Sequence, residues 1–181
     1  ALPDGFEIGR LYDGRPAGEW KVREYPEALS APHVLAQLSD KGAEHAYKVV
    51  LVDGSESTDF ELSVGIRAIG GTGDMGGGLM WHALDDRNYY VTRINPLEQN
   101  IRIYRVEHGV RKLMANHEQT IHVRQWHRLK VLMQGCQMQV FYDDAIVFDV
   151  CDKTLARGRI GLWTKSDAVT YFDDLNLIIH N

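Results

Sequence analysis

The segment from Asp59 to Ile69, DFELSVGIRAI, places an apolar side chain at almost every second position. This alternation is the pattern of a β-strand that buries one face, because successive side chains of a strand point to opposite sides. Similar short runs follow along most of the chain, and turn residues such as Asp53-Gly54 and His108-Gly109 separate them. Roughly a dozen strands at such spacing predict an all-β chain folded as a sandwich or barrel.

The expected strands share this alternation and end at turn residues. They span residues 47–52, 59–69, 79–83, 90–94, 101–106, 110–114, 126–133, 137–142, 145–150, 159–164 and 169–178. Their inward positions predict a core that contains Phe60, Leu62, Val64, Trp81, Ile101, Ile103, Leu129, Val131, Ile160 and Leu162. Pro16, Pro26 and Pro32 interrupt the segment before residue 47, which predicts edge strands and crossing loops there. We find no linker or internal repeat, so residues 1–181 are expected to form a single domain.

The composition is that of an ordinary globular protein. Hydrophobic residues make up 44% and charged residues 25% of the 181 residues, which argues against a disordered chain. A net charge of −5 lacks the basic footprint of a nucleic-acid-binding domain. No apolar run approaches the ~20 residues that span a bilayer, so no membrane span is expected. The first residue is Ala1 and not Met, which fits a processed secreted protein and equally a trimmed chain.

The two cysteines, Cys136 and Cys151, flank a predicted hairpin. If Asp143-Asp144 form its two-residue turn, Tyr142 faces Ala145 and the two cysteines face each other. Opposed residues of antiparallel strands lie roughly 4.5–5.5 Å apart at Cα, which is within reach of a disulfide. Two interpretations remain open: a disulfide, which would indicate an oxidising compartment, or two reduced thiols.

The block between residues 76 and 112 carries the main candidate site. A loop over residues 95–100 would place Arg93 opposite Arg102, and a three-residue loop at 107–109 would place Tyr104 opposite Lys112. Two adjacent arginines need an anionic partner, because neither guanidinium can lose its charge. That partner is a carboxylate of the chain, such as Glu98 or Glu61, or it is a bound carboxylate or sugar hydroxyl.

Further side chains are expected on the same side of the sheet. If Ala83 faces Tyr90, His82 points away from the core, whereas a shift by one residue would bury it. Trp163 and Lys165 also point outward. An outward Trp is a stacking surface for a sugar ring, but more often a loop covers such a side chain. The candidate ligand-binding residues are therefore His82, Arg93, Glu98, Arg102, Tyr104, Lys112, Trp163 and Lys165.

Catalytic and metal-binding signatures are weak. The chain has no G-x-S-x-G, H-E-x-x-H, P-loop or cysteine-zinc pattern, and no catalytic residue is named. Asp59 and Glu61 share a strand face as glycosidase carboxylates would, but Glu56 points the other way, and a polar strand entry is the simpler interpretation. One of Asp173 and Asp174 is expected on the apolar face of its strand, where it accepts backbone N–H bonds or helps to hold a structural calcium. No other metal or cofactor is expected.

Several phrases of the sequence resemble one family. GGGLMWHALDDRNYYVTRINPLEQNIRIYRVEHGVRK, together with WHRLKV, VFYDDAIVFDV and GRIGLWTKSDAVTYFDDL, resembles bacterial domains of the concanavalin A-like lectin/glucanase superfamily. More narrowly, it resembles the laminin-G-like and 3-keto-disaccharide hydrolase group, over residues 60–178. The resemblance implies a jelly-roll sandwich of two curved antiparallel sheets, in exported proteins that bind or process glycans. The group's usual arginine after the third strand of this block is replaced by His82, and the glucanase carboxylate motif is absent at Glu56–Glu61.

The sequence thus predicts an extracytoplasmic domain, periplasmic or secreted, that binds carbohydrate on an open sheet face. One alternative is a glycoside hydrolase, which would need two carboxyl groups within roughly 5–10 Å of each other in the same cleft. The other is a structural or interaction module without a small ligand, in which loops or a second protomer would cap the face.

Overall fold

The structure is a computed structural model that describes residues 1–180, and this range contains fourteen β-strands and no helix. The strands are β1 (Phe6–Ile8), β2 (Trp20–Glu24), β3 (His33–Gln37), β4 (Tyr47–Val52), β5 (Asp59–Gly70), β6 (Gly77–Asp85), β7 (Asn88–Asn95), β8 (Asn100–Glu107), β9 (Val110–Glu118), β10 (Trp126–Gln134), β11 (Gln137–Tyr142), β12 (Ala145–Cys151), β13 (Arg159–Lys165) and β14 (Val169–His180). Every segment expected to be a strand is one. Within residues 1–180, no helix could cross a membrane.

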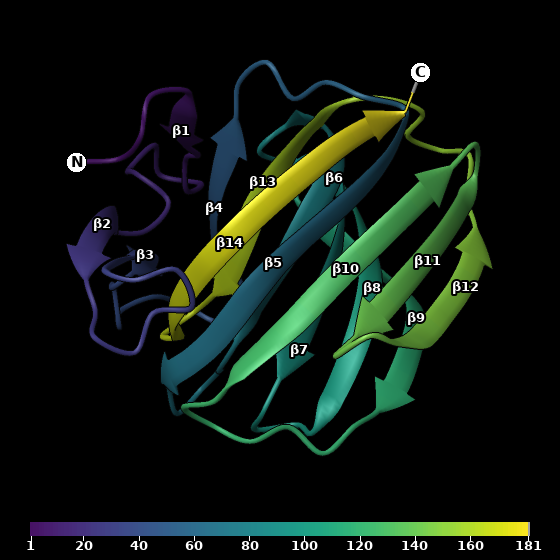
Figure 1. The fold of residues 1–181 in the computed structure, drawn as a ribbon. Helices are drawn as coiled ribbons and strands as arrows, with labels where there is room; N and C mark the ends of the chain where they lie inside the picture. Colours follow the sequence, from purple (N-terminus) through teal and green to yellow (C-terminus); the bar gives the residue numbers. More distant parts are fainter. Residues whose placement is uncertain (181) are drawn as a thin grey trace.

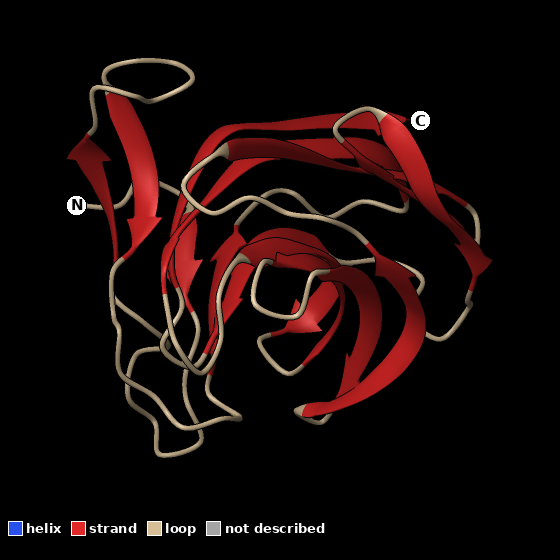
Figure 2. Cartoon of the chain, turned by 90° about the horizontal axis from the view of Figure 1, so that it is seen from below, coloured by secondary structure: helices blue, strands red, loops and turns tan. Residues whose placement is uncertain are grey.

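The strands form two antiparallel sheets of seven strands each. The order β1-β4-β13-β6-β7-β8-β9 defines the concave sheet, and the order β12-β11-β10-β5-β14-β3-β2 defines the convex sheet. Figure 1 shows β14, β5 and β10 of the convex sheet crossing in front of the concave sheet. Seen from below, the two sheets are nested arches, with the concave sheet inside the convex one (Figure 2). The predicted all-β sandwich of two curved antiparallel sheets is confirmed.

The core lies between the two arches and is made by the inward residues of both sheets. All ten residues predicted for it are buried there, from Phe60 on β5 to Leu162 on β13. The prolines of the N-terminal segment have the expected effect. β1 and β2 are edge strands of the two sheets, and irregular loops connect them to their neighbours.

The turn between β7 and β8 has the predicted register. Ile94 pairs with Ile101, and Arg93 pairs with Arg102. The side-chain oxygen of Asn95 accepts hydrogen bonds from the backbone N–H groups of Leu97 (2.9 Å) and Glu98 (3.0 Å). Because Asn can hold a turn in this way, the loop closes at a fixed length, and that length sets which residues face each other.

The prediction that His82 points away from the core is wrong, because a β-bulge interrupts β6 between Trp81 and Asp85. Trp81 pairs with Tyr90, and His82 has a positive φ of 48°. The bulge turns His82 into the core, where it is fully buried and its two ring nitrogens lie 2.8 Å and 2.9 Å from the backbone oxygens of Leu155 and Thr58. A bulge adds one residue to a strand, so the alternation expected beyond it is reversed.

The prediction that Tyr104 faces Lys112 is also wrong. The β8–β9 turn contains two residues, so Glu107 pairs with Val110, and a bulge after Ile103 places Tyr104 opposite Leu113. Lys112 instead pairs with Arg105 and points to the other face of the sheet. A shift of one residue exchanges the two faces of a strand, so Arg111 takes the position beside Tyr104.

The cysteines form the predicted disulfide, Cys136–Cys151, with their Cα atoms 4.9 Å apart. Tyr142 pairs with Ala145 as expected, but a bulge between Val140 and Phe141 shifts the rest of the hairpin. Cys151 therefore pairs with Gln137, and Cys136 lies just before β11. The bridge is confirmed, whereas the direct opposition of the two cysteines is wrong.

The carboxylates of Asp173 and Asp174 lie outside the core, because β14 bulges between Asp173 and Asn176. Asp173 accepts a hydrogen bond from the backbone N–H of Ser30 at 2.8 Å, and Asp174 accepts one from the Ser30 hydroxyl. The predicted anchoring of a neighbouring loop is therefore confirmed, whereas the expectation that one of the two carboxylates lies on the apolar face of the strand is wrong. The described residues include no cluster of three or more His, Cys, Asp or Glu side chains suited to a metal ion, and calcium binding here stays a prediction.

Candidate functional site

The face of the concave sheet that points away from the core carries a second apolar layer, whose side chains are also buried. Its members are Ala17, Val49, Leu51, Met80, Ala83, Tyr89, Val91, Tyr104, Val106 and Trp163. Trp163 points outward as predicted, and its Nε1 donates a hydrogen bond to the Tyr89 hydroxyl at 3.1 Å. Only 2% of Trp163 is exposed, and the Tyr47 ring lies 5.6 Å from it. Trp163 is therefore part of a covered floor and offers no open stacking surface.

Three arginines surround Tyr104 on this floor. The Arg102 Nη1 donates to the Tyr104 hydroxyl at 3.0 Å. The guanidinium carbon of Arg111 lies 4.3 Å from the centre of the Tyr104 ring, and that of Arg93 lies 5.8 Å away. Burial acts to raise the pKa of Tyr104, but the hydrogen bond from Arg102 and the three positive charges outweigh it and lower that pKa. We call Arg93, Arg102, Arg111, Tyr104 and Glu98 the arginine cluster.

Glu98 is the carboxylate that the paired arginines require. Its Oε2 lies 3.0 Å from Nη2 of Arg93 and 4.0 Å from Nη1 of Arg102. Arg93 also donates to the side chain of Asn100 at 2.6 Å, and burial lowers its pKa. The Arg93 side chain is almost fully enclosed, whereas 30% of the Arg102 side chain and 51% of the Glu98 side chain are exposed. The cluster thus has a closed base and an open rim.

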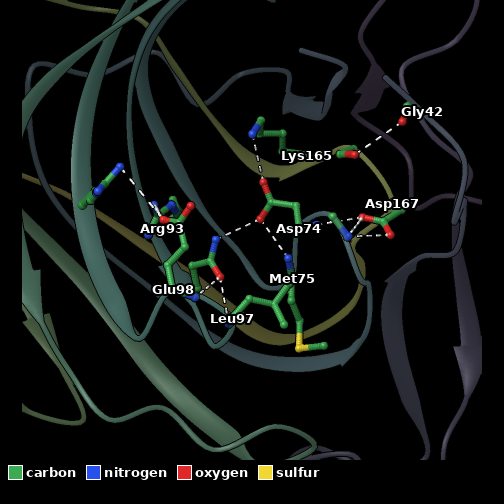
Figure 3. A network of polar contacts seen from close by, with 12 residues as sticks. Gly42, Asp74, Met75, Arg93, Leu97, Glu98, Lys165 and Asp167 are labelled. Carbon is green, nitrogen blue, oxygen red and sulfur yellow. Dashed lines mark hydrogen bonds and ion pairs between the residues drawn. The ribbon is translucent and has the colours of Figure 1, made fainter. Parts of the chain in front are cut away.

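A polar chain connects this cluster to Lys165 (Figure 3). The Lys165 ammonium lies 3.2 Å from Asp74, and Asp74 accepts a hydrogen bond from the Asn95 side chain at 3.0 Å. Asn95 in turn holds the loop that carries Glu98. Residues from β13, from the β5–β6 loop and from the β7–β8 turn are joined in this way, and the position of Glu98 depends on all three.

Asp167 fixes the loop that presents Asp74. Its carboxylate accepts hydrogen bonds from the backbone N–H groups of Thr72 (2.8 Å), Gly73 (3.0 Å) and Asp74 (2.8 Å), as Figure 3 shows in part. Burial opposes ionisation of this carboxyl, but the backbone donors outweigh it and hold its pKa well below the ordinary value. The carboxylate is therefore ionised at all ordinary pH values and keeps the loop closed.

The structure brings together six of the eight residues predicted for the site. Arg93, Glu98, Arg102, Tyr104, Trp163 and Lys165 lie on or beside the concave face, and His82 and Lys112 do not. Arg111 and Asp74 were missed. The alternation of β9 would have indicated Arg111 had the turn been assigned two residues, and the glycine-rich loop around Asp74 carries no periodic signal. Asp59 and Glu61 lie on β5 of the convex sheet, where Asp59 bonds the Gly135 N–H and Glu61 pairs with Lys130.

The comparisons with known proteins agree on the architecture. A carbohydrate-binding module, CBM66 from Bacillus subtilis, matches with a TM-score of 0.77 at 21% identity and covers 96% of this chain and 94% of its own. A Bacillus subtilis protein of unknown function with a galectin-like fold matches with a TM-score of 0.66 at 10% identity, over 95% of this chain and 88% of its own. The chain therefore shares the two-sheet sandwich fold of these structures.

A curated relative is similar in sequence. Levanase from Bacillus subtilis (strain 168) is 24% identical over 128 residues, which are 69% of this chain but 18% of levanase. The match therefore concerns a small part of that enzyme. No family model matches the chain.

Proposed function

We propose that this chain is a carbohydrate-binding module whose ligand contacts the open rim of the arginine cluster on the concave face. The supporting observation is the charge balance there. Glu98 lies within 4.0 Å of Arg93 and Arg102, and within the described residues it is their one carboxylate partner, whereas Arg111 has no ion-pair partner there. Guanidinium groups beside an exposed carboxylate offer both donors and an acceptor to sugar hydroxyls.

The comparisons support the same function. CBM66 is named as a carbohydrate-binding module, and levanase is an enzyme named for levan, a polymer of fructose. Levan and its oligosaccharides are therefore the first ligands to test. The disulfide supports a location outside the cytoplasm, either periplasmic or secreted, because such bridges persist in oxidising compartments.

Substitution of Arg102 tests this proposal. Calorimetric titration should detect binding of levan, or of another glycan from a panel of neutral and acidic polysaccharides, to the wild type. Arg102→Ala should abolish that binding and change the free energy of unfolding by no more than about 0.5 kcal/mol, because Arg102 is partly exposed and Arg93 keeps Glu98 paired.

Arg157→Ala is the matched control, because Arg157 is exposed on the β12–β13 loop and makes no ion pair within residues 1–180. It should bind like the wild type. An Arg102→Ala variant that binds normally would reject the proposed site. If the wild type binds no glycan and Arg102→Ala lowers the free energy of unfolding by more than about 1 kcal/mol, the cluster is instead a structural network.

A further inference from the structure

A pocket of about 690 Å³ lies beside the arginine cluster on the concave side of the molecule. Its walls are the loop over residues 10–19, which precedes β2, and the β3–β4 loop over residues 39–46 together with the start of β4. Asp86 and Arg87 of the β6–β7 turn and Gly109 of the β8–β9 turn complete it. Sites for small molecules typically measure roughly 300–1,000 Å³, so the pocket is large enough for a ligand bigger than one sugar ring.

Two buried polar side chains hold both walls of this pocket. The Gln37 Oε1 accepts the backbone N–H of Glu19 at 3.0 Å in one wall and that of Ser39 at 2.8 Å in the other. The Lys48 ammonium donates to the backbone oxygen of Ser39 at 2.8 Å, to its hydroxyl at 3.0 Å and to the backbone oxygen of Lys41. All three ammonium donors of Lys48 are thereby used to hold the β3–β4 loop. The walls are therefore fixed before any ligand arrives, which reduces the entropy that binding would cost.

The mouth of the pocket presents an aromatic ring to solvent. Tyr12 is 77% exposed, and the Arg87 guanidinium lies 4.5 Å from its ring centre. Arg10, Arg87 and Lys41, which also line the pocket, have no carboxylate within ion-pair distance in the part of the chain that the structure describes. An exposed ring beside cationic donors that no carboxylate neutralises is suited to a sugar, which stacks through its C–H face and accepts hydrogen bonds at its hydroxyls.

Tyr47 connects this pocket with the arginine cluster. Its side chain lines the pocket, and its ring centre lies 5.6 Å from the Arg111 guanidinium carbon. Arg111 in turn covers Tyr104 at 4.3 Å. A ligand at the rim of the cluster could therefore extend past Arg111 and Tyr47 into the pocket without leaving the concave face.

We propose that the pocket is a second carbohydrate subsite, which binds further units of an oligosaccharide whose first unit lies at the arginine cluster. This inference rests on the proposed function and adds to it the class of ligand, which is a chain of several sugars and not a monosaccharide. Tyr12 stacks on the distal unit, and Arg10, Arg87 and Lys41 donate to its hydroxyls.

Titration with levan oligosaccharides, from fructose to the pentasaccharide, tests the second subsite. Affinity of the wild type should rise about tenfold between the monosaccharide and the longer chains, which corresponds to about 1.4 kcal/mol. Tyr12→Ala should remove that gain and leave the affinity for the monosaccharide unchanged. Tyr12→Phe, which keeps the ring, should retain the gain. Thermal melts of both variants should match the wild type, because Tyr12 is exposed.

The outcomes separate the two proposals. Binding that does not depend on chain length, or a Tyr12→Ala variant that keeps the full gain, overturns the second subsite while the proposed function stands. Loss of monosaccharide binding in Tyr12→Ala, with its fold intact, also overturns it, because Tyr12 would then belong to the first site. Failure of the wild type to bind any glycan in the panel overturns both.

Discussion

Arg93 and Arg102 face each other across two strands but have different environments. Arg93 is enclosed, pairs with Glu98 and bonds Asn100, so its charge is used inside the protein. Arg102 lies at the rim, donates hydrogen bonds to the neutral side chains of Tyr104 and Asn116, and makes only a long ion pair of 4.0 Å with Glu98. The length of one loop predicted that the two arginines are adjacent. It did not distinguish their roles, because burial of Arg93 depends on loops from other parts of the chain.

The arginines around Tyr104 lead to a spectroscopic prediction. The lowered pKa means that the folded protein favours the phenolate form of Tyr104, so this side chain should ionise at a pH below the ordinary tyrosine pKa of 10.0. The phenolate absorbance of the wild type, minus that of Tyr104→Phe, should therefore appear at lower pH than for free tyrosine. Arg111→Ala should move the transition upward, because one of the three positive charges is removed.

The control for this titration is Arg157→Ala, which leaves the cluster intact and should leave the difference spectrum unchanged. If Tyr104 ionises at or above the ordinary tyrosine pKa, burial prevails over the three guanidinium charges, and the described effect of the arginines on Tyr104 is wrong.

At the scale of elements, the regular parts of the strands could be predicted and their irregularities could not. Alternation placed all core positions of β5, β8, β10 and β13 correctly, because one buried face dictates the period. Bulges in β6, β8 and β11 each shifted the register by one or two residues. A bulge is an extra residue that is stabilised by contacts with distant parts of the chain, such as those of His82 with the carbonyl groups of Leu155 and Thr58, so the sequence around it does not reveal its position.

The β13–β14 turn stabilises the β5–β6 loop through Asp167, and this contact should depend on pH. Because the pKa of Asp167 is lower in the folded than in the unfolded state, its contribution is fully present above the ordinary pKa of 3.8 and is lost as pH falls below it. Asp167→Asn should lower the free energy of unfolding by about 1–2 kcal/mol at neutral pH, since hydrogen bonds to a charged group are replaced by weaker ones. Urea unfolding across the pH range measures it.

Below pH 3.8 the difference between the wild type and Asp167→Asn should shrink, because the unfolded wild type binds a proton at Asp167 that the folded protein does not yet bind. Asp4→Asn is the matched control, since Asp4 is exposed and accepts no side-chain hydrogen bond within residues 1–180. Equal stability of Asp167→Asn and the wild type at neutral pH would show that the loop is held by other contacts.

At the scale of the whole molecule, the candidate site and the disulfide belong to different sheets. The candidate site lies on the face of the concave sheet that points away from the core, whereas the disulfide closes the β11–β12 hairpin at the edge of the convex sheet. The sandwich could be predicted from sequence because it needs only two half-buried sheets. The pocket could not, because its walls come from loops without periodicity that meet only after the chain has folded.

The separation of the sheets predicts that stability can be changed without changing ligand binding. Replacement of both Cys136 and Cys151 by Ala should lower the free energy of unfolding by about 3 kcal/mol, which is the chain-entropy value for closing a loop of roughly 15 residues. Urea unfolding measures this change, with the reduced wild type as control. Glycan affinity of the folded variant should equal that of the wild type, and a reduced affinity would indicate that the two sheets are coupled.

Strand β13 has no solvent-facing side in its middle. Leu162 packs into the core, and its neighbour Trp163 lies in the floor of the site, so both faces of the strand are enclosed. A new side chain in the floor would disturb the packing of the sheet as well as the ligand. Changes of ligand preference, in evolution or in the laboratory, should therefore accumulate at Tyr12, Arg87 and Arg111, which lie in loops and on an edge strand, while β13 diverges slowly.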